Sequence, residues 1–184
     1  MAEYRLLTIW RIEAPLEAVY AAIHNSLHWP VWWPGMQKVE EVTAGDASGI
    51  NSVLRYVWQG QLPYQMVFEV RATRIEKCVA IEGAVQGDLE GVGRWHFISE
   101  GAVSVVQYEW HVRSTRLWMN LIAPFARPMF IHNHGILMRQ GAEGLARHLG
   151  APLVAQESID LMADTCRRKQ SRQRQPTGEC EAET

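Results

Sequence analysis

Two side chains in the second half of the chain could transfer protons, His134 and Tyr108. Imidazole titrates near neutral pH and a phenol both donates and accepts hydrogen bonds, so the two could act in general acid–base catalysis. One face of the helix expected here carries Phe130, Leu137 and Gly141. By helical spacing His134 belongs to the same face, which would aim it at the rest of the domain. The alternative is a buried structural histidine, bonded to Tyr108 or to a backbone carbonyl.

The spacing of the other histidines, cysteines and serines does not indicate metal-assisted or nucleophilic chemistry. His132 and His134 are two residues apart and would diverge by about 200° on a helix, so they cannot share an ion. His24 and His28 are four apart, but they fall where a helix is expected to end. There is no Gly-x-Ser-x-Gly elbow, and the three dispersed cysteines have no neighbouring base pattern. We therefore expect no metal site and no cofactor.

The glycine-rich segment 87–93 superficially matches a phosphate-binding loop. It lacks both the Gly-Lys-Ser or Gly-Lys-Thr ending and a following helix, so we do not expect it to hold phosphate. Asp88 and Glu90 flank a turn, and catalysis by paired carboxylates would need both of them in one cavity. Arg94 and Trp95 alternate in direction, and we place Arg94 outside. A register slip of one residue would instead make Arg94 an acid-binding group inside.

Aromatic residues are the outstanding feature of the composition, with eight tryptophans in the chain. Three of them lie in Trp29-Pro-Val-Trp-Trp-Pro-Gly35. Each proline fixes its own φ and pushes the preceding residue toward an extended conformation, so we expect a short irregular bend, a rigid corner that closes one end of the fold. On the strands that follow, we place Trp58, Tyr108 and Trp110 on the concave face, where they are either ordinary core or ligand contacts.

Length and charge narrow the class of protein. The 184 residues suffice for one domain, and the net charge of −2 provides no field that would attract nucleic acid. No run of about 18 apolar residues is present, so we expect no integral membrane association. The N-terminus lacks the pattern of a signal peptide, and the three dispersed cysteines do not form a disulfide framework. These features predict a cytoplasmic protein.

Residue periodicity predicts the elements that must position these side chains. Helical spacing indicates a short helix over residues 16–23 and continues over residues 117–149. Pro124 and Pro128 interrupt the first part of this second stretch, so we expect the firm helix from about Pro128 to Gly150. A weak helical turn is expected over residues 151–163. Alternation of apolar and polar residues indicates seven strands, over residues 4–13, 39–43, 53–59, 65–75, 79–85, 93–99 and 103–115.

These elements predict an α+β fold, a curved seven-stranded antiparallel sheet wrapped around a long C-terminal helix, with two short helices after the first strand. Residues 1–150 would form this helix-grip domain, and residues 151–184 a C-terminal extension that is largely a disordered tail from Asp164 onward. A curved sheet cannot bury its concave face unaided. A helix laid across that face does so, and a cavity can remain between helix and sheet.

Several short motifs accompany this order of elements along residues 4–150. They are Ala14-Pro-Leu-Glu-Ala-Val-Tyr20, Trp29-Pro-x-Trp-Trp-Pro-Gly35, Gly60-x-Leu-Pro-Tyr64, Gly87-Asp-Leu-Glu-Gly-x-Gly-Arg-Trp95, Tyr108-x-Trp110, Trp118-Met-Asn120 and Asn133-His134. Together they resemble the START-like (Bet v 1-like, SRPBCC) superfamily, and within it the polyketide cyclase/dehydrase-like branch. The resemblance implies the helix-grip fold. It does not fix a function, because that scaffold carries lipid carriers, hormone receptors, allergens, cyclases and oxygenase subunits.

The leading hypothesis is binding of a hydrophobic small molecule (lipid, polyketide-like or aromatic) between the sheet and the C-terminal helix. The alternative is a metal-free polyketide cyclase/aromatase-type enzyme, in which His134 or Tyr108 transfers protons. A third hypothesis is an interaction module, a homodimer formed through exposed tryptophans of the bend. The residues expected to contact the ligand are Trp58, Tyr64, Phe68, Trp95, Tyr108, Trp110, Phe130, His134 and Leu137.

Overall fold

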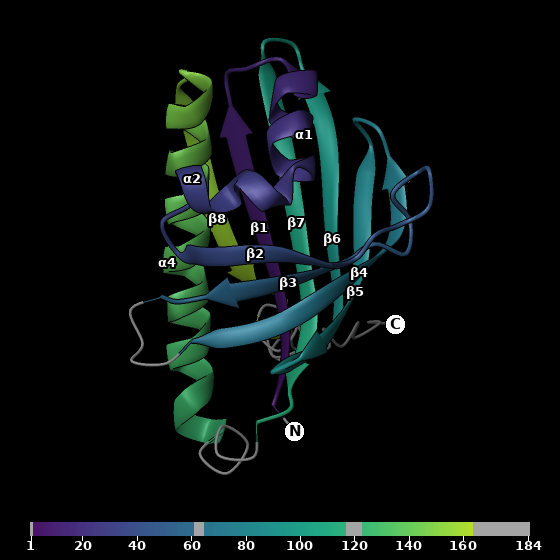
Figure 1. Ribbon diagram of the computed structural model, residues 1–184. Coiled ribbons are helices and arrows are strands. Elements are labelled where there is room, and N and C mark those ends of the chain that lie inside the picture. The colour runs from purple at the N-terminus through teal and green to yellow at the C-terminus, as the bar shows by residue number, and fades with distance from the viewer. Residues whose placement is uncertain (1, 61–64, 117–122, 164–184) are drawn as a thin grey trace, which may run out of the picture.

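A curved antiparallel sheet of eight strands forms the main layer of the molecule (Figure 1). The computed structural model describes residues 2–60, 65–116 and 123–163. The strand order is β2-β3-β4-β5-β6-β7-β1-β8, and neighbouring strands pair antiparallel throughout. The strands are β1 (Glu3–Ile12), β2 (Met36–Thr43), β3 (Val53–Trp58), β4 (Met66–Glu76), β5 (Ala80–Gly87), β6 (Leu89–Glu100), β7 (Val103–Ser114) and β8 (Leu153–Asp160).

The helices lie on the inner side of this curve. After β1 come α1 (Leu16–His24), a 3-10 turn η1 (Ser26–His28) and α2 (Trp29–Trp32). The long helix α4 (Ala123–Leu149) runs beside β8 and β1, while β2, β3 and β4 cross in front of β1 and β7 (Figure 1). The α+β helix-grip architecture predicted from the sequence is therefore confirmed.

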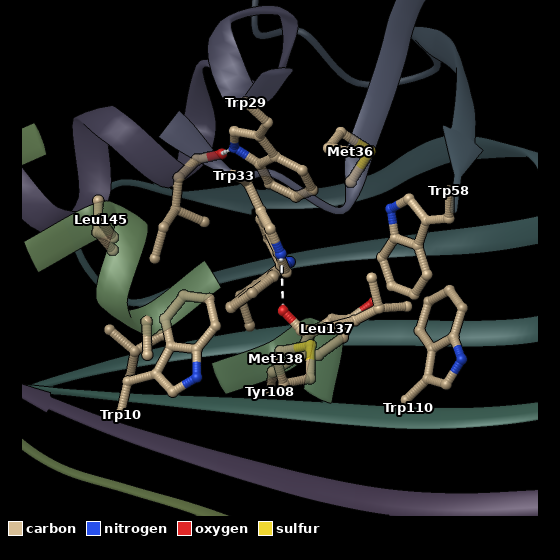
Figure 2. Close-up of a cluster of buried hydrophobic side chains, with 14 of the residues drawn as sticks. Trp10, Trp29, Trp33, Met36, Trp58, Tyr108, Trp110, Leu137, Met138 and Leu145 are labelled. Carbon is tan, nitrogen blue, oxygen red and sulfur yellow. Dashed lines mark hydrogen bonds between the residues drawn. The ribbon is translucent and has the colours of Figure 1, made fainter. Parts of the chain in front are cut away.

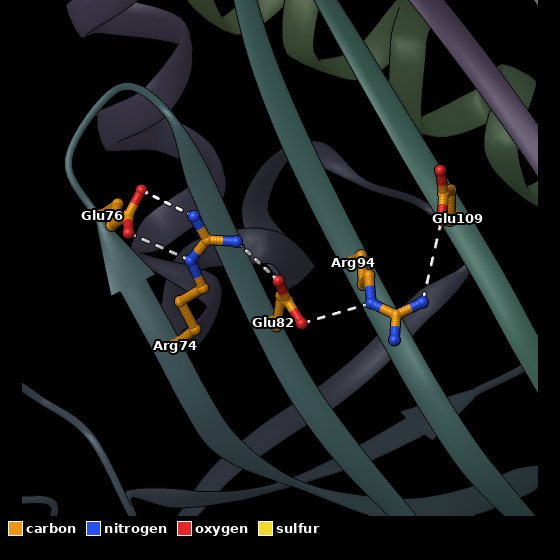
Figure 3. A network of polar contacts seen from close by, with 5 residues as sticks. All are labelled: Arg74, Glu76, Glu82, Arg94 and Glu109. Atoms are coloured by element: carbon orange, nitrogen blue, oxygen red, sulfur yellow. Dashed lines mark hydrogen bonds and ion pairs between the residues drawn. The ribbon is translucent and has the colours of Figure 1, made fainter.

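The alternation read from the sequence correctly predicts the two faces of the sheet. On β7, Tyr108 and Trp110 are buried while His111 and Arg113 are exposed. Arg94 points outward, as predicted. The convex face carries a ladder of ion pairs across β4, β5, β6 and β7, formed by Arg74, Glu76, Glu82, Arg94 and Glu109 (Figure 3). Such exposed pairs add little stability each, so the concave face must supply most of the free energy of folding.

Helix α4 ends where the sequence predicts and begins earlier. Gly150 adopts φ +62°, and its N–H bonds the carbonyl of Arg147 while the N–H of Ala151 bonds that of Ala146. This is a Schellman cap. The helix was expected from about Pro128, but it starts at Ala123 and contains Pro128. One proline in the second turn removes one hydrogen bond, and the packed remainder of the helix tolerates that loss.

The segment after α4 is an eighth strand, so the helical turn expected over 151–163 is wrong for most of that range, and only residues 161–163 are helical. Leu153–Asp160 pairs with β1, with Leu6 opposite Asp160 and Trp10 opposite Gln156. The outer edge of β1 offers unpaired backbone N–H and C=O groups. Because the sequence of residues 153–160 has only a weak preference for helix, pairing with this edge determines that the segment is a strand. The expectation of a disordered tail from Asp164 onward concerns residues outside those described.

The tryptophan segment is more regular than predicted. Trp29–Trp32 forms one helical turn, and Trp29 has helical angles although Pro30 follows it. Pro30 lies in the first turn, where a missing N–H leaves no helical bond unmade. The indole of Trp29 donates to the carbonyl of Ile23 at 3.0 Å, which fixes this conformation. Trp29, Trp32 and Trp33 are all buried, so they are unavailable as the exposed dimer contact considered above.

Trp33 attaches this turn to helix α4. Its indole N–H donates to the backbone carbonyl of Leu137 at 2.8 Å (Figure 2). Two glycines of α4 permit the approach. A Cβ at Gly141 would lie 2.5 Å from the Trp33 ring, and a Cβ at Gly144 would overlap the carbonyl oxygen of Trp32. The contact therefore depends on bare backbone at these two positions.

Substituting Gly144 by alanine should destabilise the protein, because the new methyl group meets backbone that cannot rotate away. We expect a loss of roughly 1–3 kcal/mol in the free energy of unfolding. Gly135 of the same helix has no atom within 4 Å of an added Cβ. Gly135→Ala should therefore be neutral or stabilising by up to about 1 kcal/mol. Urea unfolding of both variants measures the difference, and equal stabilities would contradict this packing.

Candidate functional site

A cavity of about 350 Å³ lies between the concave face of the sheet and the segment formed by the end of α1, η1 and α2. Of the described side chains of α4, none lines it. A cavity was expected between the sheet and the C-terminal helix, whereas this one lies under the short helices. Trp33 separates it from α4, since its ring packs against Trp10 and Trp58 and fills the space between α4 and the middle of the sheet.

The structure brings five of the nine predicted ligand residues together in this cavity wall. They come from β3, β4, β6 and β7, and they contact one another. Trp95 stacks on Tyr108 with ring centroids 4.0 Å apart, and Trp110 lies 5.9 Å from Trp58 and 5.6 Å from Phe68. Rings packed in this way hold their rotamers, so the wall is preformed and rigid. The five residues are Trp58, Phe68, Trp95, Tyr108 and Trp110.

Two glycines that the sequence analysis did not single out shape the floor of the cavity. Gly83 and Gly93 face each other on β5 and β6, and both line the cavity. A Cβ at Gly93 would lie 2.7 Å from the Trp110 ring and 3.2 Å from the Tyr108 hydroxyl. The space thus exists because two adjacent strands carry no side chain where larger rings converge. Glycine inside a strand is the sequence signal for such a close approach.

The wall also contains polar side chains, among them Asn25, Ser26, Glu41 and Ser52, and two tyrosines in their neutral form. The Tyr56 hydroxyl donates to Ser26 Oγ at 3.0 Å, and burial raises the pKa of Tyr56 to about 12. Burial also raises the pKa of Tyr108 well above its usual value, with a smaller contribution from Tyr56. Both phenols therefore remain protonated at neutral pH and act as hydrogen-bond donors or acceptors rather than as bases.

Three other predicted site residues are placed elsewhere, and a fourth is not described. Phe130 packs on Tyr4 with ring centroids 4.1 Å apart, on the far side of the core from the cavity. Leu137 lies beneath Trp33, and its carbonyl accepts the indole bond. Tyr64 is outside the described residues. His134 lines a second cavity, between α4 and β8, and does not line the first.

His134 is buried, and its Nε2 has no hydrogen-bond partner among the described residues. Burial lowers its pKa to about 4, because a charged imidazolium would lose its hydration there. The ring is therefore neutral at physiological pH. No group of three or more metal-binding side chains occurs in the described part of the chain, and none of its helices is long and apolar enough to cross a bilayer.

The comparison with protein families identifies the fold's relatives. Residues 9–150 match the family model described as polyketide cyclase / dehydrase and lipid transport. The chain belongs to this family. The match runs from within β1 to the end of α4, and it confirms the resemblance read from the motifs. Strand β8, which contributes to the second cavity, lies outside it. A search of the curated proteins found no match.

Solved structures agree on the fold at low sequence identity. A START superfamily protein from Mycobacterium smegmatis aligns with a TM-score of 0.65 at 15% identity, covering 80% of this chain and 97% of that one. The Zhui aromatase/cyclase from Streptomyces sp. R1128 gives 0.58 at 15% identity, covering 81% and 93%. Ginseng major latex-like protein 151 from Panax ginseng gives 0.57 at 12% identity, covering 80% and 97%. These likenesses establish the architecture.

The pKa of His134 should make stability depend on pH. The unfolded imidazole takes up a proton near pH 6.5 and the folded one near pH 4, so folding loses stability as pH falls through this window. Between pH 7.5 and pH 4.5 the free energy of unfolding should fall for the wild type, and it should fall by roughly 3 kcal/mol less for His134→Leu. Urea unfolding at the two pH values tests this. The exposed neighbour His132, changed to leucine, serves as the control and should keep the wild-type dependence.

Proposed function

We propose that this protein binds a small hydrophobic molecule in the cavity beneath its short helices. The observation that carries the proposal is the cavity itself, walled by Trp58, Phe68, Trp95 and Trp110 and floored by the facing pair Gly83 and Gly93. Aromatic walls favour flat or cyclic apolar ligands. The family description, which includes lipid transport, supports the same class of function.

The size of the cavity restricts the ligand. Its volume of about 350 Å³ is at the lower end of the roughly 300–1,000 Å³ that is typical of small-molecule sites. A compact ring system or a single short acyl chain fits such a space, whereas a lipid with two long chains does not. The Tyr108 hydroxyl lies beside the floor and provides one polar contact for an oxygen atom on the ligand.

A cyclase-type activity is the second candidate, and Tyr108 is the observation that favours it. A neutral phenol in an apolar cavity can donate a proton or a hydrogen bond to a carbonyl oxygen during ring closure. His134 lies in the other cavity and would not act on the same ligand. Under this candidate Tyr108→Phe abolishes turnover of a poly-β-keto substrate and leaves binding of an apolar probe intact.

Binding can be tested with the neutral fluorophore N-phenyl-1-naphthylamine, which should quench the tryptophans of the wall. A methyl group at position 93 would push the Trp110 ring into the cavity, so Gly93→Ala should weaken binding by about tenfold, as expected when a well-packed site loses about 1.4 kcal/mol. Native mass spectrometry of freshly purified protein should also reveal a co-purifying small molecule.

The matched control is Arg94→Gln, on the same strand but on the convex face. It should bind the probe as wild type does. Circular dichroism and thermal melting must show that both variants are folded. If the wild type does not bind the probe, or if Gly93→Ala binds it as tightly as the wild type does, this cavity is not the binding site.

A further inference from the structure

The second cavity lies between helix α4 and the β1–β8 edge of the sheet. Its volume is about 330 Å³, and it shares no described lining residue with the aromatic cavity. Apolar side chains from the helix and the sheet, among them Ile131, Ile136 and Leu6, form part of the wall. The remainder is polar, in contrast with the aromatic cavity.

The polar part comes from a row of side chains on the inner face of β1 and β8. Thr8 pairs with Ser158 in the sheet, and their hydroxyl oxygens are 3.4 Å apart. The amide of Gln156 donates to the same Ser158 oxygen at 3.0 Å. An inner sheet face normally carries apolar residues where a helix covers it. Thr8 is buried, Gln156 is half-buried and Ser158 is exposed, so this row leaves hydrogen-bonding capacity at the open side of the cavity, next to α4.

The charged side chains around this cavity differ in whether they have an oppositely charged partner. Asp160, which lines it, is neutralised by Arg127 at 2.8 Å. Arg139, from the next turns of α4, also lines the cavity and has no carboxylate of the described residues within ion-pair distance. Arg139 is exposed, and its guanidinium is uncompensated within the described part of the chain. A guanidinium binds carboxylate groups in bidentate geometry.

His134 forms part of the same wall. It is only 3% exposed, and its Nε2 has no partner among the described residues. A buried polar side chain without a partner is rare in a folded protein and costs free energy unless another group or a bound molecule satisfies it. His134 therefore adds a buried polar group to the wall that Ser158 and Arg139 also line.

We propose that this cavity binds a small carboxylic acid with an apolar body. Arg139 pairs with the carboxylate, and Ser158 and Gln156 provide further hydrogen bonds. Ile131 and Ile136 pack against the apolar part. The chain would then hold two ligands of different chemistry, a neutral apolar one under the short helices and an anionic one under α4.

Benzoate tests this proposal, with benzamide as its uncharged analogue. NMR spectra of the full-length protein should show benzoate shifting the backbone amide of Gly135 and the ring protons of His134. Benzamide should bind about tenfold or more weakly, since hydrogen bonds to a charged group are worth about 1.5–3 kcal/mol. Equal binding of the two compounds, or no binding of benzoate, would overturn the proposal.

Variants separate this site from the aromatic cavity. Arg139→Gln should weaken benzoate binding by about tenfold or more, through loss of the charge-assisted contact. Ser158→Ala should weaken it by a smaller factor, and Arg94→Gln should leave it unchanged. Gly93→Ala impairs only the aromatic cavity, so it should retain benzoate binding. If benzoate instead shifts the tryptophan signals of the aromatic wall and Gly93→Ala abolishes its binding, the second site does not exist.

Discussion

The close contact between helix α4 and the turn Trp29–Trp32 is the constraint on which the rest of the structure depends. Bare backbone at Gly141 and Gly144 lets the helix reach the tryptophan turn, and the indole of Trp33 bonds the carbonyl of Leu137. Because this contact fills the middle of the concave face, the free volume is divided. One part remains under the short helices and the other between α4 and β8.

The two resulting spaces differ in chemistry because different strands form their floors. The strands β3 to β7 contribute large rings and two facing glycines, which give a rigid and nearly apolar chamber. The pair β1 and β8 contributes hydroxyl and amide groups. A single curved sheet can therefore present a mainly apolar interior at its centre and a partly open, hydrogen-bonding surface at its edge, both next to helices.

Sequence periodicity correctly predicts the elements whose signals are local. The prediction fails for segments whose conformation depends on contacts with other parts of the fold. Alternation along β7 and the glycine cap at Gly150 are local signals, and both predictions are confirmed. Strand β8 depends on its pairing with β1, and the helical turn Trp29–Trp32 depends on two indole bonds, to the carbonyls of Ile23 and Leu137. The separation of His134 from Tyr108 has the same origin, since only the packing of Trp33 reveals that one face of α4 does not reach the aromatic cavity.

The position of β1 between β7 and β8 has a consequence for how the chain must fold. Glu3 pairs with Arg113 of β7, and Leu6 pairs with Asp160 of β8. Strand β1 is therefore made first and receives its second neighbour from β8, which is made much later. Pairings between residues so far apart in sequence are slow, because the intervening chain must be ordered before they are gained. On the ribosome, the edge of β1 that pairs with β7 stays unpaired until residue 113 has emerged, and the edge that pairs with β8 until residue 160 has emerged. Strand β1 is thus open to incorrect pairing until both of its neighbours have been made.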